Sequence, residues 1–136
     1  MYGAEAPRFL VKSICGGRQL DIGRRERGGV SVIDVVGKID RLTDSNALRS
    51  YISGLAEKDE RIIALNLAQV TYLDSGALNV MIYSQNVLSK LGGKLVIIEP
   101  NEYVHDVLNV VGFDKLINIY PSEKEFVDDV KKLKKS

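Results

Sequence analysis

Residues 62–80 of the chain read IIALNLAQVTYLDSGALNV, and this stretch decides the fold class. Residues 62–67 form a short, nearly all-apolar run between polar segments, which is typical of a central strand covered on both faces. From Gly76 onward, apolar residues recur at spacings that predict an amphipathic helix. The expected core face of that helix consists of Leu78, Met81, Ile82, Gln85, Leu88 and Leu91. Gly92 and Gly93 then end the helix, because glycine readily adopts the left-handed conformation found there.

The alternation of strands and helices continues toward the C-terminus. The elements expected there are a strand at 95–98, a helix at 103–111 with Gly112 as its stop, and a strand at 116–120. Ser122 and Glu125 then form a Ser-x-x-Glu capping box, which predicts a final helix to about Lys134.

The pattern is equally regular toward the N-terminus as far as residue 20. Two β-rich segments, 20–23 and 30–36, predict a hairpin with Gly28 and Gly29 in its turn. The segment 43–46 offers several N-cap candidates for a helix. The apolar positions of that helix are Ala47, Leu48, Tyr51, Ile52 and Leu55.

The resulting element order, ββαβαβαβα, predicts the α/β class. Strands that alternate with single helices require right-handed crossovers and therefore a largely parallel sheet, to which the hairpin adds an antiparallel member. We expect a mixed sheet of about four or five strands with about four helices. Because no linker or internal repeat appears, residues 19–136 are interpreted as one domain. Residues 1–18 are an N-terminal extension, either an extra strand or a disordered segment.

The composition limits the chemistry that the chain can perform. Its 136 residues suffice for one domain, and 45% hydrophobic with 27% charged residues is an ordinary globular composition. Cys15 and His105 are the only residues of their types, so neither an intramolecular disulfide nor a multi-histidine or cysteine-rich metal site is expected. The sequence also contains no phosphate-binding or dinucleotide-binding glycine motif. We therefore expect no enzyme, no catalytic residue, no metal site and no cofactor.

Charge and hydropathy indicate the kind of partner. The chain has a net charge of +1, but its basic residues concentrate at the two ends, and segment 28–130 carries fifteen acids against nine bases. An acidic body fits a protein partner with a basic surface better than it fits nucleic acid. No apolar run is long enough to cross a bilayer and no secretory signal is recognisable, so we expect a cytoplasmic protein that does not insert into membranes.

The loop between the central strand and its helix is the strongest candidate site. Asp74 and Ser75 lie where a buried strand gives way to a helix, at the carboxyl end of a parallel sheet, where ligands usually bind such folds. A phosphoryl group on Ser75 would face free backbone N–H groups and the positive end of the helix dipole. Gly76 and Ala77 are small enough for another protein to approach the hydroxyl. The alternative is that Asp74 or Ser75 simply caps the helix.

A second polar cluster lies in residues 37–43, which also follow a strand and open a helix. Asp40 and Thr43 could cap that helix. They could instead form a partner-binding rim beside Ser75, which requires the two preceding strands to be neighbours. The sequence alone leaves both possibilities open.

Several segments match a known family in order and spacing. They are Val-Val-Gly-Lys-Ile-Asp-Arg-Leu-Thr at 35–43, Ala-Leu-Asn-Leu at 64–67, Tyr-Leu-Asp-Ser-Gly-Ala-Leu at 72–78, Gly-Gly-Lys-Leu at 92–95 and Leu-Asn-Val-Val-Gly-Phe-Asp-Lys-Leu at 108–116. Over about one hundred residues the chain thereby resembles a STAS domain, the fold of sulfate-transporter tails and bacterial anti-sigma factor antagonists. The most specific element is the family signature Asp-Ser-x-Gly-Leu-Gly, which aligns with Asp74 to Asn79.

The resemblance to the antagonist branch implies partner switching in the regulation of transcription. In that branch the serine after the signature aspartate, here Ser75, is phosphorylated by a serine kinase that is also an anti-sigma factor. The unphosphorylated antagonist binds the kinase and frees a sigma factor, and a serine phosphatase restores the serine. ATP and Mg²⁺ belong to the kinase. The implied partner-binding residues are Asp40, Thr43, Asp74, Ser75, Gly76, Ala77 and Asn79.

Two departures from the signature keep an alternative open. Ala77 and Asn79 occupy the positions of its two glycines, and the larger Asn79 bears on whether a kinase of this family docks in the usual way. The alternative function is a STAS subunit of a transport or other regulatory complex that is not switched by phosphorylation. A third reading, an enzyme or nucleotide-binding protein using the same loop, lacks an accompanying base, metal set or phosphate loop.

Overall fold

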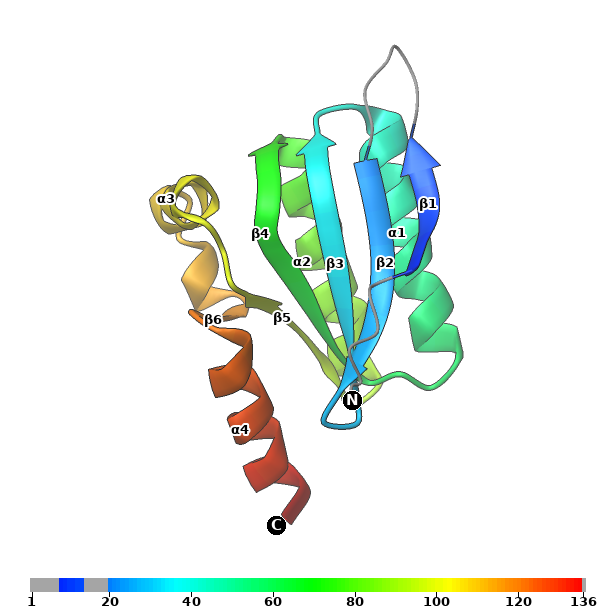
Figure 1. The fold of residues 1–136 in the computed structure, drawn as a ribbon, viewed down its shortest axis with the longest axis vertical. Coiled ribbons are helices and arrows are strands. Elements are labelled where there is room, and N and C mark those ends of the chain that lie inside the picture. The colour runs from blue at the N-terminus through cyan, green and yellow to red at the C-terminus, as the bar shows by residue number, and fades with distance from the viewer. Residues whose placement is uncertain (1–7, 14–19, 136) are drawn as a thin grey trace.

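In the computed structural model, which describes residues 8–13 and 20–135, the strands lie side by side in the order in which they occur in the chain (Figure 1). The strands are β1 (Arg8–Ser13), β2 (Leu20–Arg27), β3 (Val30–Ile39), β4 (Ile62–Leu73), β5 (Lys94–Ile98) and β6 (Asn118–Tyr120). The helices are α1 (Leu42–Glu57), α2 (Ser75–Lys90), α3 (Glu102–Val110) and α4 (Glu123–Lys135), with a short 3₁₀ turn, η2, at Phe113–Lys115. β1, β2 and β3 pair antiparallel, and β3 to β6 pair parallel.

This architecture confirms the predicted α/β class and the order of elements from β2 onward. The sheet has six strands within the described residues, because β1 lies in the N-terminal extension and pairs with β2. The rest of that extension, including Cys15, lies outside the described residues. No helix in the described ranges is long and apolar enough to cross a membrane.

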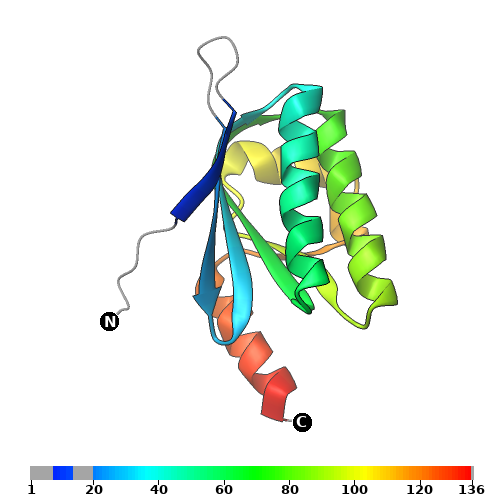
Figure 2. The ribbon, with the colours of Figure 1, turned by 90° about the vertical axis from the view of Figure 1, so that its right-hand side faces the viewer.

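One face of the sheet is covered by α1 and α2, which run side by side along it (Figure 2). Ile33, Leu65 and Ile97 project from β3, β4 and β5 into this layer and belong to one buried cluster with Leu48 of α1 and Met81 of α2. This cluster is the main core of the domain, and the two helices that cover it carry most of the candidate site.

The opposite face of the sheet is covered in part by α4. Val32, Ala64 and Val96 project to this side and form a second buried cluster with Phe126 and Val130 of α4. Because successive residues of a strand point to opposite faces, Val32 and Ile33 enter different layers. The near-continuous apolar runs of the central strands follow from this burial on both sides.

Local signals in the sequence account for the connections. Gly28 and Gly29 form the two-residue hairpin loop between β2 and β3 with φ of +62° and +83°, the positive values that a type I′ turn requires. Gly92, with φ +85°, follows the end of α2. Ser122 accepts a hydrogen bond from the Glu125 N–H at 3.2 Å at the start of α4. The predicted hairpin, helix end and cap are thus confirmed.

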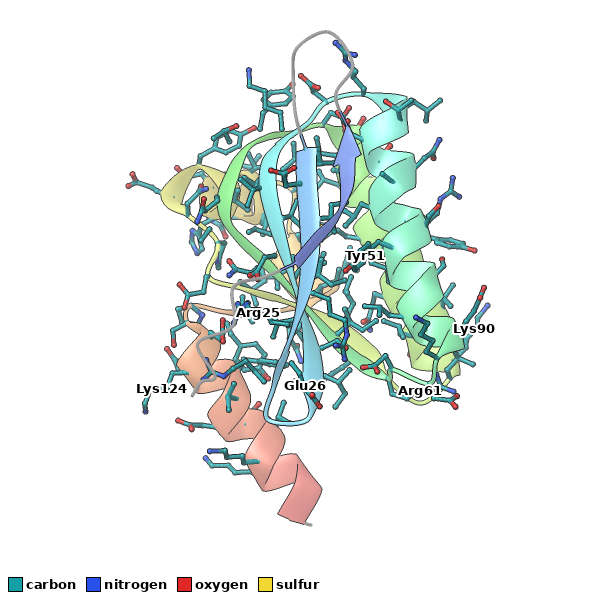
Figure 3. All side chains as sticks on the ribbon, turned by 45° about the vertical axis from the view of Figure 1, so that its right-hand side comes forward. Arg25, Glu26, Tyr51, Arg61, Lys90 and Lys124 are labelled. Atoms are coloured by element: carbon teal, nitrogen blue, oxygen red, sulfur yellow. The ribbon has the colours of Figure 1, made fainter. Side chains whose placement is uncertain are left out.

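A network of ion pairs links α4 to strands β2 and β3 of the sheet. Arg25 is on β2 (Figure 3). Its guanidinium binds Asp34 of β3, with Nε–Oδ2 at 2.6 Å, and Glu123 of α4, with Nη2–Oε1 at 2.9 Å. Arg27 also reaches Glu123, and Asn66 donates to Asp34. The Asp34 and Glu123 hydrogen bonds raise the pKa of Arg25, and the hydrogen bond from Arg25 lowers the pKa of Glu123 below its ordinary 4.5.

The lowered pKa of Glu123 predicts a pH-dependent contribution to stability. Since the folded protein holds this carboxyl ionised more strongly than the unfolded chain does, the pairing stabilises the fold above pH 4.5 and its contribution disappears as pH falls below that value. We expect Glu123→Gln to lower the free energy of unfolding by about 2 kcal/mol at neutral pH. The loss should shrink as pH falls below 4.5. Urea denaturation across this range measures it, and Glu26→Gln, an exposed acid on β2, is the control. A loss independent of pH would contradict the prediction.

Candidate functional site

The candidate site lies where β3 and β4 end side by side. Ile39 pairs with Leu73 in the parallel ladder, and the Asp74 N–H donates to the Ile39 carbonyl at 3.0 Å. The neighbouring strands that the partner-rim hypothesis requires are therefore present. The two segments that follow these strands, around Asp40 and around Ser75, meet at the same edge of the sheet.

Asp74 is the N-cap of α2. Its backbone is extended, with φ −104° and ψ −176°, and its Oδ1 accepts the Ala77 N–H at 3.0 Å. The cap satisfies one of the backbone donors that the start of a helix leaves without a partner. Of the two possibilities left open by the sequence, Asp74 rather than Ser75 performs the capping.

Ser75 is the first residue of α2 and is exposed. Gly76 faces α1, because a Cβ placed there would lie 3.2 Å from the Asp74 Oδ1 and 3.4 Å from the Ser45 Oγ. Ala77 is buried in the main core, so its small size serves the packing of α2. Asn79 is exposed one turn further along the helix.

Helix α1 begins earlier than the sequence suggests. Arg41, in an extended conformation, is its N-cap and makes no side-chain capping hydrogen bond. The prediction that a residue of segment 43–46, or Asp40, caps this helix is therefore wrong. Asp44 instead reaches back, and its Oδ2 accepts the Asp40 N–H at 3.3 Å. Asp40 and Thr43 are both exposed, on the connection from β3 and in the first turn of α1.

A groove of about 260 Å³ runs between the N-terminal halves of α1 and α2 beside Ser75. It is lined by Leu42, Ser45, Asn46, Arg49, Gly76, Asn79, Val80 and Tyr83. The Cζ of Arg49 lies 5.9 Å from the centre of the Tyr83 ring, and its Nη2 donates to the Asn46 Oδ1 at 2.9 Å. Arg49 and Tyr83 were not predicted as site residues. The only signal in the sequence is that both lie outside the apolar faces of their helices.

The other flank of Ser75 is formed by α3 and the end of β4. The Tyr72 and Tyr103 rings are stacked with centroids 6.4 Å apart, and the Tyr103 Oη accepts the Leu73 N–H at 3.3 Å. Asn101, the N-cap of α3, accepts the Val104 N–H at 2.9 Å through its Oδ1. This flank was not predicted either, because its contacts join residues about thirty positions apart.

Large apolar side chains are exposed on both flanks of Ser75. Leu42 and Tyr83 on the groove side are 75% and 52% exposed, and Tyr72 and Tyr103 on the other side are 45% and 38% exposed. Exposed aromatic side chains are over-represented where proteins bind one another. The arrangement is suited to docking a protein around a single hydroxyl.

Among the residues that the structure describes, no three His, Cys, Asp or Glu side chains are placed together to hold a metal ion. His105 is exposed on α3. What the site offers chemically is an accessible hydroxyl at a helix N-terminus.

Comparison with known proteins gives a consistent set of relatives. The STAS domain family model matches residues 21–126. The anti-sigma F factor antagonist of Paenibacillus polymyxa is 24% identical over 104 residues, which span 76% of this chain and 89% of that protein. A solved anti-sigma factor antagonist from Mycobacterium paratuberculosis superposes with a TM-score of 0.73 at 22% identity, covering 82% of this chain and 94% of the other. The phosphorylated form of the Bacillus cell fate determinant SpoIIAA gives 0.63 at 18% identity, covering 80% and 98%.

Proposed function

Because the chain belongs to the STAS domain family, we propose that it is an anti-sigma factor antagonist that acts by partner switching at Ser75. Unmodified, it binds a serine kinase that is also an anti-sigma factor, and a sigma factor is released. Phosphorylation of Ser75 ends this binding, and a serine phosphatase reverses the modification. The chain is substrate and ligand in this cycle, while the kinase supplies ATP and Mg²⁺. The cycle takes place in the bacterial cytoplasm.

The observation that carries the proposal is the setting of the Ser75 hydroxyl. It is exposed at the start of α2, between the Leu42–Tyr83 flank and the Tyr72–Tyr103 flank. A kinase needs an accessible hydroxyl, and a tight complex needs apolar anchors around it. The named antagonists among the relatives, and a solved relative in a phosphorylated form, are consistent with this use of the fold.

Charge provides the switch. A phosphoryl group adds about −1.5 to −2 charges at neutral pH. On Ser75 it would lie next to the Asp74 carboxylate, which already accepts the hydrogen bond of the Ala77 N–H. In the free protein, water screens this repulsion and the helix N-terminus favours the anion. In a packed complex the phosphate would lose its water, so phosphorylation weakens binding more than it disturbs the fold.

The predicted partner-binding residues divide by their positions. Asp40, Thr43 and Asn79 are exposed around Ser75, so in this proposal they touch the partner directly. Asp74 and Gly76 fix the start of α2 and its approach to α1. Ala77 is buried, so it acts by packing alone.

The first test is mass spectrometry of the protein purified from its own host during growth and under stress. We expect one phosphoryl group on Ser75, absent in Ser75→Ala and retained in Ser89→Ala, which removes an exposed serine near the other end of α2. Ser75→Ala should still bind the kinase, and Ser75→Asp should bind it at least about tenfold more weakly. Phosphate on another residue, with Ser75 unmodified throughout, would overturn the proposal.

A second candidate function rests on Asn79, which stands exposed beside Ser75 where the family signature has glycine. A bulkier polar side chain there fits a STAS subunit held permanently in a transport or other regulatory complex. Such a subunit would co-purify with its complex whether or not ATP is added, and Ser75 would stay unmodified. The same host purification therefore separates the two functions.

A further inference from the structure

We propose that the groove between α1 and α2 receives a carboxylate side chain of the partner protein, held by Arg49. The inference rests on the proposed function, since it assumes a protein partner at this end of the sheet. It adds the chemistry of the partner's contact, an aspartate or glutamate, and a residue that selects for it. The groove is lined by α1 residues Leu42 and Arg49 and α2 residues Asn79 and Tyr83, among others.

Arg49 is the charged residue of the groove. The other described residues that line it are apolar or neutral polar, so among the described residues no carboxylate of the groove lining competes for the guanidinium. Four other arginines, Arg24, Arg25, Arg27 and Arg61, each pair with a carboxylate of the chain. Within the part of the chain that the structure describes, Arg49 contacts the Asn46 amide oxygen and the Tyr83 ring instead. It is therefore an exposed cation available to a partner.

The guanidinium is also held in a defined orientation. The hydrogen bond from Nη2 to Asn46 and the position 5.9 Å from the Tyr83 ring centre both limit its freedom. A guanidinium carries five N–H donors, so one bond to Asn46 leaves enough donors for a two-point contact with a carboxylate. An arginine ordered in advance loses less conformational entropy when it binds.

The charge of the rest of the domain makes this contact selective. Segment 28–130 carries fifteen acids against nine bases, so most of its surface attracts a basic partner. Arg49 is an exception placed inside the groove between α1 and α2. A partner that is basic elsewhere but carries one acid at this point matches both charges. A partner with a lysine or arginine at this point is rejected by like-charge repulsion.

The contact at Arg49 lies apart from the switch. Tyr83, over which Arg49 sits, is eight residues beyond Ser75 on α2, which corresponds to about 12 Å of helix. That separation exceeds the roughly 8 Å over which charges act at physiological salt. Losses caused at Arg49 and at Ser75 should therefore multiply without further coupling. In this arrangement Ser75 decides when the partner binds, and Arg49 contributes to which partner binds.

The test uses the serine kinase retained from host lysate on the tagged full chain carrying Ser75→Ala, which is then purified and titrated. We expect Arg49→Glu to weaken its binding by at least about tenfold and Arg49→Lys by only a few-fold. Lys90→Glu, at the far end of α2 (Figure 3), should stay within about twofold and makes the same change of charge. Thermal unfolding of each variant verifies that it is folded. Replacing the facing acid of the kinase by lysine should restore the binding of Arg49→Glu.

Three results would overturn the inference. If Arg49→Glu binds as well as the parent while Ser75→Asp binds weakly, the groove proposal fails and the proposed function stands. If Leu42→Ala weakens binding but Arg49→Glu does not, the groove accepts an apolar side chain instead of a carboxylate. If neither the natural chain nor Ser75→Ala retains a serine kinase, the proposed function fails and the inference fails with it.

Discussion

Gly93→Ala is expected to destabilise the fold by more than about 3 kcal/mol. An added Cβ would lie 2.0 Å from the carbonyl oxygen of Arg61 and 2.7 Å from its carbonyl carbon. These are backbone atoms, so no side-chain rotation can relieve the overlap. Hydrogen bonds also hold both backbone segments in place. The Lys94 N–H donates to the same Arg61 oxygen at 2.8 Å, and the Gly93 N–H donates to the Leu88 carbonyl at 2.8 Å.

The measurement is urea unfolding of the purified chain, followed by circular dichroism. Gly54→Ala is the matched control, because nothing lies within 4 Å of a Cβ at this position in the last turn of α1. It should stabilise the protein by up to about 1 kcal/mol, since alanine favours the helix. Opposite signs for the same added methyl group would establish that the contact with Arg61 decides the result. A loss below about 1 kcal/mol for Gly93→Ala would contradict the prediction.

Asn101→Asp is expected to lower stability about as much as Asn101→Ala, by about 2–3 kcal/mol. The Asn101 Nδ2 donates toward the carbonyl oxygens of Leu67, Ala68 and Val70, at 3.4, 3.1 and 2.7 Å. The β4–β5 ladder has already ended at Asn66, so the side chain replaces the missing strand. Aspartate is as good a helix cap as asparagine. Aspartate nevertheless places an oxygen where the Asn101 Nδ2 donates, and this oxygen faces the three carbonyl oxygens without a hydrogen bond. The variant therefore keeps the helix cap but loses stability.

Denaturation of the two Asn101 variants separates capping from the bonds to β4. Asn109→Asp, an exposed site near the end of α3, is the control and should change stability by no more than about 0.5 kcal/mol. Hydrogen exchange adds a local measurement. We expect the Leu73 amide to exchange faster in the Asn101 variants than in the natural protein. Its N–H donates to Tyr103 of α3, the helix that Asn101 caps. Stability close to that of the natural protein in Asn101→Asp would mean that the cap is the main role of this residue.

Elements with local signals could be predicted from the sequence. Glycine pairs gave the hairpin and the end of α2, because their conformations depend on neighbouring residues alone. The apolar run at the start of β4 and the helical spacing after it were enough for the fold class. Ser75 could be placed for the same reason, since it stands between two segments with different periods.

Features that depend on distant contacts could not be predicted. β4 pairs with β3 as far as Leu73, although its ladder with β5 ends at Asn66. Asn101 and Tyr103 bind the side of β4 that β5 leaves open, and neither contact is visible in the strand itself. The apolar pattern of α2 was misjudged at two positions. Leu91, the residue that follows the helix, is exposed, and the polar Ser84 near the middle of the helix is buried. The start of α1 was misplaced because Arg41, which is not a typical capping residue, takes that position. The Arg49–Tyr83 pair joins two helices whose facing surfaces only the tertiary packing defines.

The order of strands in the sheet also bears on how the chain folds. Each strand pairs with the next strand in the chain, and the most distant of these pairings, such as Ile39 with Leu73, close loops of only moderate length. Loop-closure entropy is therefore low at each step, and the sheet can grow by adding one strand at a time as synthesis proceeds. The contact between Arg25 and Glu123 is different, because it spans 98 residues. α4 can dock only after it has emerged from the ribosome. The ion pair therefore adds α4 to a sheet that the earlier residues are already able to form.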